Sequence, residues 1–449
     1  MKLKNLIASM ESVDENGNPI DPDQNEEDQA PETGGDSLEA ELAEVSEAAG
    51  EAEEAEDNVE ELTEVAEGLE SIANDIHASL ESGGLDPVAA RGYQHAINAH
   101  MARLGQHDGQ TVSMEDFGGA SSRHDATVSM EAGAREWLKR IWAAIKNAIA
   151  KARDALKAMW IKLFDAAPKL KRRAEALAAK AKGLKESKEK SIKIAGGVAS
   201  DLAIGNTMVK SLGELTGQLR KVADGALVEF QQEAVAYGDG VTKLVKGAKF
   251  DTDEGFKKSI AGLGQISVPT FAGAKVASND ARFKGKTVER TDRLPGNKAI
   301  FISNKAKTGD SLEGYVDFYS TLRVEVLDFT PNGQSVNDQT MPLPSPADIA
   351  AAAKEIGEIA ARIAGYNQKF KQTEAYAKGV VAAGDSFSAE ADKSDKLSPE
   401  SKRAAQGILR IAKNAAEIVD AGVGSIVRYV VATAGKSLVV AERAAAAYE

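Results

Sequence analysis

The sign of the formal charge reverses once along this chain, and the reversal divides it into two parts. Residues 1–131 hold 32 acidic residues and five basic residues, a formal charge of −27. Residues 132–449 hold 50 basic and 37 acidic residues, a formal charge of +13. The chain is long enough for two or three domains. We therefore expect two electrostatically opposite bodies joined in one polypeptide.

Cysteine usage and hydropathy limit the compartment and the kind of site. The chain has no cysteine, so it can form neither a disulfide nor a thiolate metal site. The start of the chain has two lysines and then an apolar stretch of only three residues, which is too short for a secretory signal. No run of eighteen uncharged apolar residues occurs, since Arg428 and Lys436 interrupt the apolar C-terminal stretch, and no membrane-spanning helix is expected.

The acidic part, residues 1–131, divides into three stretches by composition. Residues 12–35 are rich in Pro, Gly and acidic residues and are expected to be disordered. Residues 36–104 are expected to form amphipathic helices, one of which follows Asp86-Pro87. Their apolar stripe comprises Leu38, Leu42, Val45, Val59, Leu62, Leu69, Ile72, Ile76 and Leu80. Residues 105–131 are rich in Gly, Ser and Thr and predict an accessible linker.

The basic part begins with a helical region, residues 132–263. Its first 33 residues, 132–164, place apolar residues on one stripe and most lysines off it, and they hold all three tryptophans. A break is expected at Pro168, after which the basic pattern resumes. No proline occurs between Pro168 and Pro269, and the composition favours long helices there.

A small β module, residues 264–344, is expected between the helical regions. Two strands are predicted around the turn at Pro295-Gly296, and alternation over 314–329 predicts a further strand. Helices return over 345–449, with N-caps at Ser345 and Ser398, and are expected to pack on residues 132–263. The predicted fold class is mainly α with an inserted β module, an α+β arrangement.

The sequence contains no recognisable catalytic constellation. The tripeptide Gly435-Lys436-Ser437 lacks the glycine that a phosphate loop requires five positions earlier, where Val430 stands. No histidine follows His124, so the basic part has no histidine for catalysis or metal binding. We therefore expect no enzyme activity, no metal and no cofactor.

The pentapeptide TVSME occurs twice, at 111–115 and 127–131, and ASME occurs at 8–11. Several proteases recognise a small residue two positions before the cut and a glutamate directly before it, within an extended strand. Candidate cleavage sites therefore pair Ser9 with Glu11, Ser113 with Glu115, and Ser129 with Glu131. The structural alternative is that Ser129 caps the following helix, which explains one copy but not three.

These residues give the chain a resemblance to the internal head, or inner-body, proteins of phiKZ-like giant tailed phages. Such proteins carry propeptides that a prohead protease removes after Ser/Ala/Gly-x-Glu. The matching residues are the three Ser-Met-Glu tripeptides, and residues 83–105 also look like propeptide segments of virion proteins. The resemblance covers residues 1–131. It implies synthesis in a bacterial cytoplasm, packaging inside the phage head, cleavage after Glu131, and inner-head or scaffold proteins as partners.

The basic helices then have three interpretations. They could bind packaged double-stranded DNA through phosphates, without reading bases. Alternatively, helix 132–164 could bind the host membrane after ejection, or its tryptophans could simply pack in a core. The candidate DNA or membrane contacts are Trp137, Lys139, Arg140, Trp142, Lys146, Lys151, Arg153, Lys157, Trp160, Lys162, Lys171, Arg172 and Arg173. A cytoplasmic enzyme or regulator with an acidic tail is the third alternative, and the lack of a catalytic constellation in the sequence disfavours the enzyme.

Overall fold

The computed structural model describes residues 161–448 with short gaps, residues 87–103, and six residues between Val65 and Ile76. The described residues before and after the boundary between Trp160 and Ile161 belong to two compact units. The gaps are 162, 163, 165, 186, 188, 206, 210, 277–279, 308, 310 and 331–335. The predictions for residues 12–35 and for the linker 105–131 lie outside the described residues.

The described pieces of the N-terminal part are helical. Leu69, Ile72 and Ile76 belong to the predicted apolar stripe, and all three are buried. Helix α3 (Pro87–Arg103) begins at the predicted proline, and its Ile97 is fully buried. These described residues are helical and buried, and the other six positions of the predicted apolar stripe lie outside the described residues.

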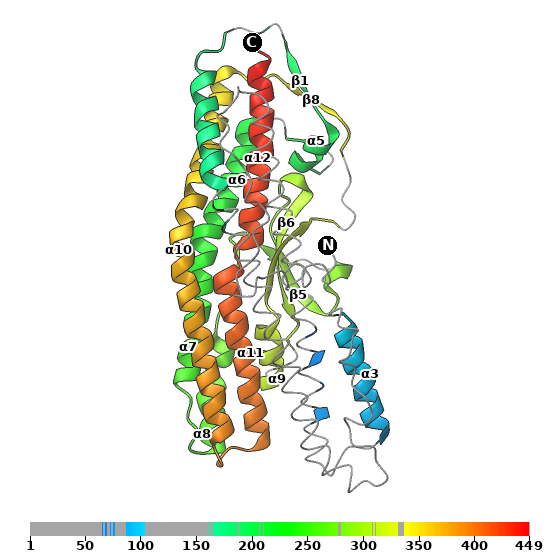
Figure 1. The fold of residues 1–449 in the computed structure, drawn as a ribbon, viewed down its shortest axis with the longest axis vertical. Helices are drawn as coiled ribbons and strands as arrows, with labels where there is room; N and C mark the ends of the chain where they lie inside the picture. Colours follow the sequence, from blue (N-terminus) through cyan, green and yellow to red (C-terminus); the bar gives the residue numbers. More distant parts are fainter. Residues whose placement is uncertain are drawn as a thin grey trace, which may run out of the picture. The chain divides into compact units, whose positions relative to one another are not determined.

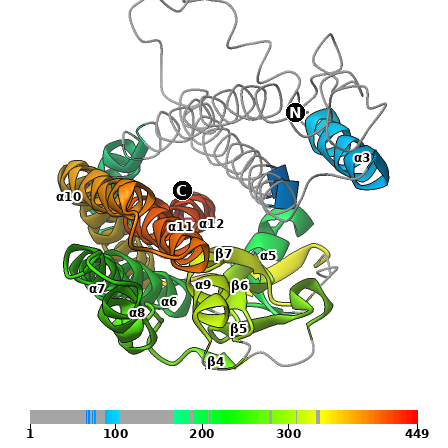
Figure 2. The same cartoon turned by 90° about the horizontal axis from the view of Figure 1, so that it is seen from below.

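The larger unit is a helical bundle, confirming the mainly α prediction (Figure 1). The longest helix among the described residues is α10 (Pro346–Lys393), which packs on α11 (Pro399–Ala421) and α12 (Gly424–Ala446). Facing these is a run of helix from α6 (Leu212–Asp224) through the π-helix η1 (Gly225–Phe230) into α7 (Gln231–Lys246). Figure 2 shows these helices on one side of the unit and the sheet on the other.

Serine side chains begin two of the bundle helices, as predicted. Ser345 accepts a hydrogen bond from the Asp348 backbone amide while the Asp348 carboxylate accepts one from the Ser345 amide. The Ser398 hydroxyl caps α11 by accepting a hydrogen bond from the Ser401 backbone amide, while the Ser398 amide donates to Asp253. In both helices a proline follows the cap, where its missing N–H leaves no bond unmade.

The C-terminal helices form the centre of the bundle. One stretch of described helix, Pro399–Ala446, is long and apolar enough to cross a membrane, but 72% of its most apolar window is buried inside the fold. The tripeptide Gly435-Lys436-Ser437 lies within α12, and Ser437 donates a hydrogen bond to the carbonyl of Thr433. This helical placement agrees with the rejection of a phosphate loop.

The β module contains a four-stranded antiparallel sheet in the order β4-β5-β6-β7. The strands are β4 (Lys275–Val276), β5 (Lys286–Arg290), β6 (Lys298–Lys305) and β7 (Arg323–Asp328). The predicted turn joins β5 to β6, and Gly296 adopts a φ of 74° there. Phe283, Val288, Ala299 and Phe301 form a small core on the sheet.

The prediction of a strand across residues 314–329 is wrong in its first half. Residues Leu312–Ser320 form helix α9, capped by the Ser311 hydroxyl, and only β7 is extended. Val316 and Tyr319 lie three positions apart and both are buried, so the helical period fits as well as alternation does. The Ser311 hydroxyl, which accepts a hydrogen bond from the Gly314 amide, favours the helix.

The prediction of long helices between Pro168 and Pro269 also needs correction. A strand β1 (Ser191–Ile194) pairs with β8 (Gln339–Pro342), and the short helix α5 (Gly196–Leu202) follows it. Two further short strands, β2 (Ala203–Ile204) and β3 (Thr207–Met208), precede α6, and α8 (Asp253–Ile260) and η2 (Ala261–Gln265) follow α7.

The predicted break at Pro168 is absent, since residues 166–181 form one helix that includes it. The buried positions Leu170, Ala174 and Leu177 hold this helix against the bundle. This packing offsets the loss of one backbone hydrogen bond at proline.

Candidate nucleic-acid interface

The predicted functional residues are divided between the described and undescribed parts of the chain. The six cleavage residues, and every predicted contact from Trp137 to Lys162, lie outside the described residues. Lys171, Arg172 and Arg173 are described, and all three lie on the helix of residues 166–181. This helix therefore contains all the predicted contact residues that the structure describes.

Periodicity places the three basic residues differently around the helix. Leu170, Ala174 and Leu177 recur at helical spacing and are buried, which fixes the inward face. Arg172 is exposed, and the Lys171 side chain is 44% exposed in an ion pair with Glu175 one turn later, at 3.8 Å. These two residues face the surface.

Arg173 has a structural partner inside the bundle. Its Nε donates a hydrogen bond to Oε1 of Glu442 at 2.5 Å, and its Nη2 donates a second hydrogen bond to Oε2 of the same carboxylate. Its side chain is only 10% exposed. The guanidinium is engaged in holding its helix to α12, which leaves Lys171 and Arg172 as the described predicted contacts at the surface.

The basic character continues beyond the predicted residues, along what we name the basic segment, residues 169–193. This segment has ten basic and three acidic residues. Exposed cations follow Arg173 at Lys180, Lys182, Lys185, Lys190 and Lys193. They were not selected from the sequence, although the density of lysine in 180–193 was the available signal.

Backbone contacts fix the second half of the basic segment on the bundle. The Ser187 hydroxyl donates to the carbonyl of Ala447, and the amide of Leu343 donates to the carbonyl of Lys190. In β1 the Lys193 side chain is exposed while Ile192 and Ile194 on either side are buried. The lysines are thus displayed from a fixed backbone.

Several cations of the β module are paired with carboxylates. On the sheet, Lys298 pairs with Asp328 at 2.9 Å and Lys275 with Asp292 at 2.8 Å. Hydrogen bonds from Arg282 hold the pKa of Asp280 below its usual value. The basic segment, with ten basic and three acidic residues, is a stretch of the described surface with an excess of positive charge.

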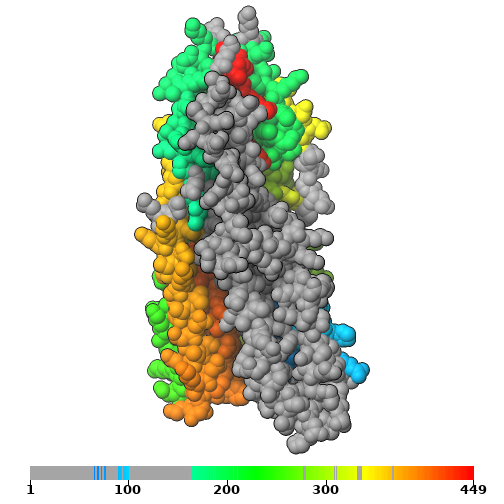
Figure 3. Space-filling view, viewed as in Figure 1, coloured from blue at the N-terminus to red at the C-terminus, as the bar shows by residue number. Residues whose placement is uncertain are grey.

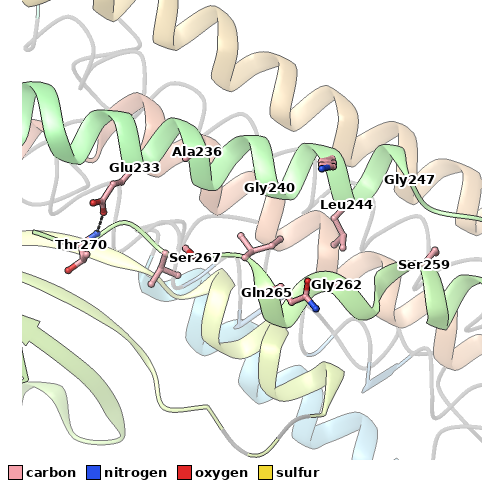
Figure 4. A pocket seen from close by; sticks show the side chains of 13 residues that line it. Glu233, Ala236, Gly240, Leu244, Gly247, Ser259, Gly262, Gln265, Ser267 and Thr270 are labelled. Carbon is pink, nitrogen blue, oxygen red and sulfur yellow. Dashed lines mark hydrogen bonds between the residues drawn. The ribbon is translucent and has the colours of Figure 1, made fainter.

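A groove beside α7 offers few charged groups that could bind or act on a ligand. It has a volume of about 790 Å³ and lies between α7 and the stretch from α8 to Thr270 (Figure 4). Its charged lining residues are Glu233 and Lys243, and Glu233 accepts a hydrogen bond from the Thr270 amide at 2.7 Å. The carboxylate thereby fastens the loop to α7.

Among the residues that the structure describes, no group of three or more His, Asp and Glu side chains is arranged to hold a metal ion. A family model for phiKZ-like phage internal head proteins matches residues 36–443, and the chain belongs to this family. No curated protein and no solved structure matches the chain.

Family membership gives a structural protein packaged in the interior of the phage head. The match also extends the resemblance, which rested on residues 1–131, across the basic body as far as residue 443. The family match therefore covers most of the acidic part and nearly all of the basic part.

Proposed function

We propose that this chain is a non-enzymatic internal head protein whose acidic part is removed by the prohead protease, leaving a basic body that binds packaged DNA without sequence specificity. The observation that carries the proposal is the coincidence of the second TVSME with the reversal of charge. Cleavage after Glu131 would convert a chain of −14 into a product of +13.

Timing gives the acidic part a physical role. A basic body in the bacterial cytoplasm, where we propose that the chain is made, binds nucleic acid indiscriminately, because phosphate contacts release counterions whatever the base sequence. A covalently attached segment of −27 offsets that field until the head has assembled around its inner-head and scaffold partners. Cleavage then exposes the basic surface to the packaged DNA.

The basic segment supports the DNA side of the proposal. Lysine and arginine side chains on a fixed backbone suit contacts with phosphates, which position a protein without reading bases. Arg172, Lys182, Lys185 and Lys190 are exposed along it. The mature protein would add the basic residues from Lys139 to Lys162 to these contacts.

DNA retention at increasing salt tests this role. We expect replacement of Arg172, Lys182, Lys185 and Lys190 by alanine to weaken binding equally on unrelated DNA sequences and to lower the salt slope by about one per lost contact. The matched control replaces four exposed lysines elsewhere, Lys243, Lys246, Lys369 and Lys371, with the same loss of charge. Equal losses in both variants would contradict a localised interface.

The same protein should be tested on anionic lipid vesicles. Vesicle leakage without salt-sensitive DNA retention would favour the membrane-active alternative, in which helix 132–164 and its three tryptophans act on the host envelope. Salt-sensitive DNA retention without leakage is the result expected for the proposed role.

A further inference from the structure

A second groove lies beside the basic segment, between the helix of residues 166–181 and the first half of α10. Its volume is about 490 Å³. The helix and α10 run side by side in both ribbon views (Figures 1 and 2), and α10 reaches the surface in Figure 3. Small residues line the space between the two helices, and we call them the floor of the groove: Ala178, Ala179, Ala350, Ala351, Gly357 and Ala361.

The small side chains allow a close approach of backbones. A Cβ atom added to Gly357 would lie 3.7 Å from the Cβ of Ala174, so the two helices are already close at that level. The trough between them has alanine on both walls. A third helix with a narrow apolar stripe can seat itself in such a trough.

The rim of the groove is positively charged. It carries three lysines, Lys171, Lys182 and Lys354, against two glutamates, Glu175 and Glu358. Glu175 pairs with Lys171 at 3.8 Å, and Glu358 pairs with Arg220 at 3.1 Å and with Lys354 at 3.9 Å, so Lys182 and Arg220 supply the excess of positive charge. With the basic segment along one wall, the groove favours an acidic occupant over a basic one.

We infer that residues 36–64 of this same chain occupy the groove before cleavage. These residues hold thirteen acidic side chains and no basic one. Leu38, Leu42, Val45 and Ala49 follow helical spacing and form a narrow stripe that suits the alanine floor. The family match begins at residue 36, so this stretch belongs to the same family unit as the body.

Docking in the groove would place the acidic segment against Lys171, Lys182 and their neighbours, where it shields the basic segment from nucleic acid. This shielding rests on the proposed DNA association. The docking of residues 36–64 in the groove does not depend on DNA association, so separate experiments test the docking and the shielding.

Cross-linking in the full-length protein tests the docking. The chain has no native cysteine, so two introduced cysteines report one pair. Ala49→Cys is combined with Ala351→Cys on the groove floor, and the matched control combines it with Ala375→Cys, an exposed alanine of α10 that does not line the groove. A short thiol-specific cross-linker is then added at low protein concentration.

We expect a high yield of intramolecular cross-link from the pair with Ala351→Cys and a low yield from the pair with Ala375→Cys. Equal yields from both pairs would overturn the docking, as would products that join two chains. Filling the groove with Ala351→Trp should raise the DNA affinity of the uncut protein by about tenfold and leave that of the processed protein unchanged. Unchanged affinity of the uncut protein would overturn the shielding. Failure of the processed protein to bind DNA would overturn the proposed function while the cross-link stands.

Discussion

Arg173 and Glu442 lie 269 residues apart in the sequence and form a two-pronged ion pair between the helix of residues 166–181 and α12. Their side chains are 10% and 26% exposed, so solvent screens the pair only partly. This contact fastens the helix that begins the basic segment to the last helix of the chain.

Removal of one partner of this pair should destabilise the bundle. We expect Arg173→Met to lower the free energy of unfolding by about 2–3 kcal/mol, because the Glu442 carboxylate is left half-buried without its donor. Urea denaturation followed by circular dichroism measures this change. Lys171→Met, which removes an exposed charge from the same helix, should cost about 0.5 kcal/mol or less. Similar losses in the two variants would mean that the Arg173 pair is no stronger than a surface pair.

Close packing of α9 on α11 provides a second test. A Cβ atom added to Gly407 would lie 2.8 Å from Cγ2 of Val316, a stiff side chain that cannot move aside freely. We expect Gly407→Ala to destabilise the protein by about 1–3 kcal/mol through overpacking. Thermal unfolding measures the loss, and adding Val316→Ala should recover part of it.

The matched control for this substitution is Gly379→Ala in α10, where no heavy atom lies within 4 Å of the added Cβ. There the lower flexibility of alanine should stabilise the helix by about 0.5–1 kcal/mol. A stabilising Gly407→Ala substitution would show that α9 does not press on α11 as described.

The helix α11 N-terminus should respond to acid. The Ser401 and Ser398 hydroxyls, together with the Ser398 amide, lower the pKa of Asp253 well below its usual range. Because the folded pKa is depressed, the contribution of Asp253 to stability is present above the unfolded value of about 3.9 and is lost as the pH falls below it. We therefore expect Asp253→Asn to lower the urea midpoint at pH 7 and to lower it much less near pH 2.

Asp251→Asn is the control for this acid response, since Asp251 is exposed and lies two residues earlier. It should change the urea midpoint little at either pH. If the difference between the wild type and Asp253→Asn stayed constant between pH 7 and pH 2, the hydrogen bonds from Ser398 would not depend on the charge of Asp253.

The elements that were predictable from the sequence are those whose signals are local. Ser345-Pro346 and Ser398-Pro399 contain both the cap and the first helical residue, and the structure begins α10 and α11 there. The apolar positions of helix α9 also fit strand alternation, so they do not distinguish the two structures, and only the cap at Ser311 indicates the helix.

Long-range pairing explains the other differences. Strand β1 is extended because residues Gln339–Pro342 lie beside it, a partner that no local pattern in Ser191–Ile194 reveals. The candidate interface shows the same limit, since lysine density marks the basic segment but not the engagement of Arg173 with Glu442. Charge density can be read from composition, whereas pairing depends on the fold.

The N-terminal residue of the protein in purified phage particles tests the central claim most directly. Mass spectrometry of particle-derived protein, compared with protein from infected cells before head maturation, identifies it. We predict a particle form that begins at Ala132 and lacks the acidic part, beside a longer form in the cells. A particle form that still begins at Met1 or Lys2, with residues 1–131 attached, would contradict the account.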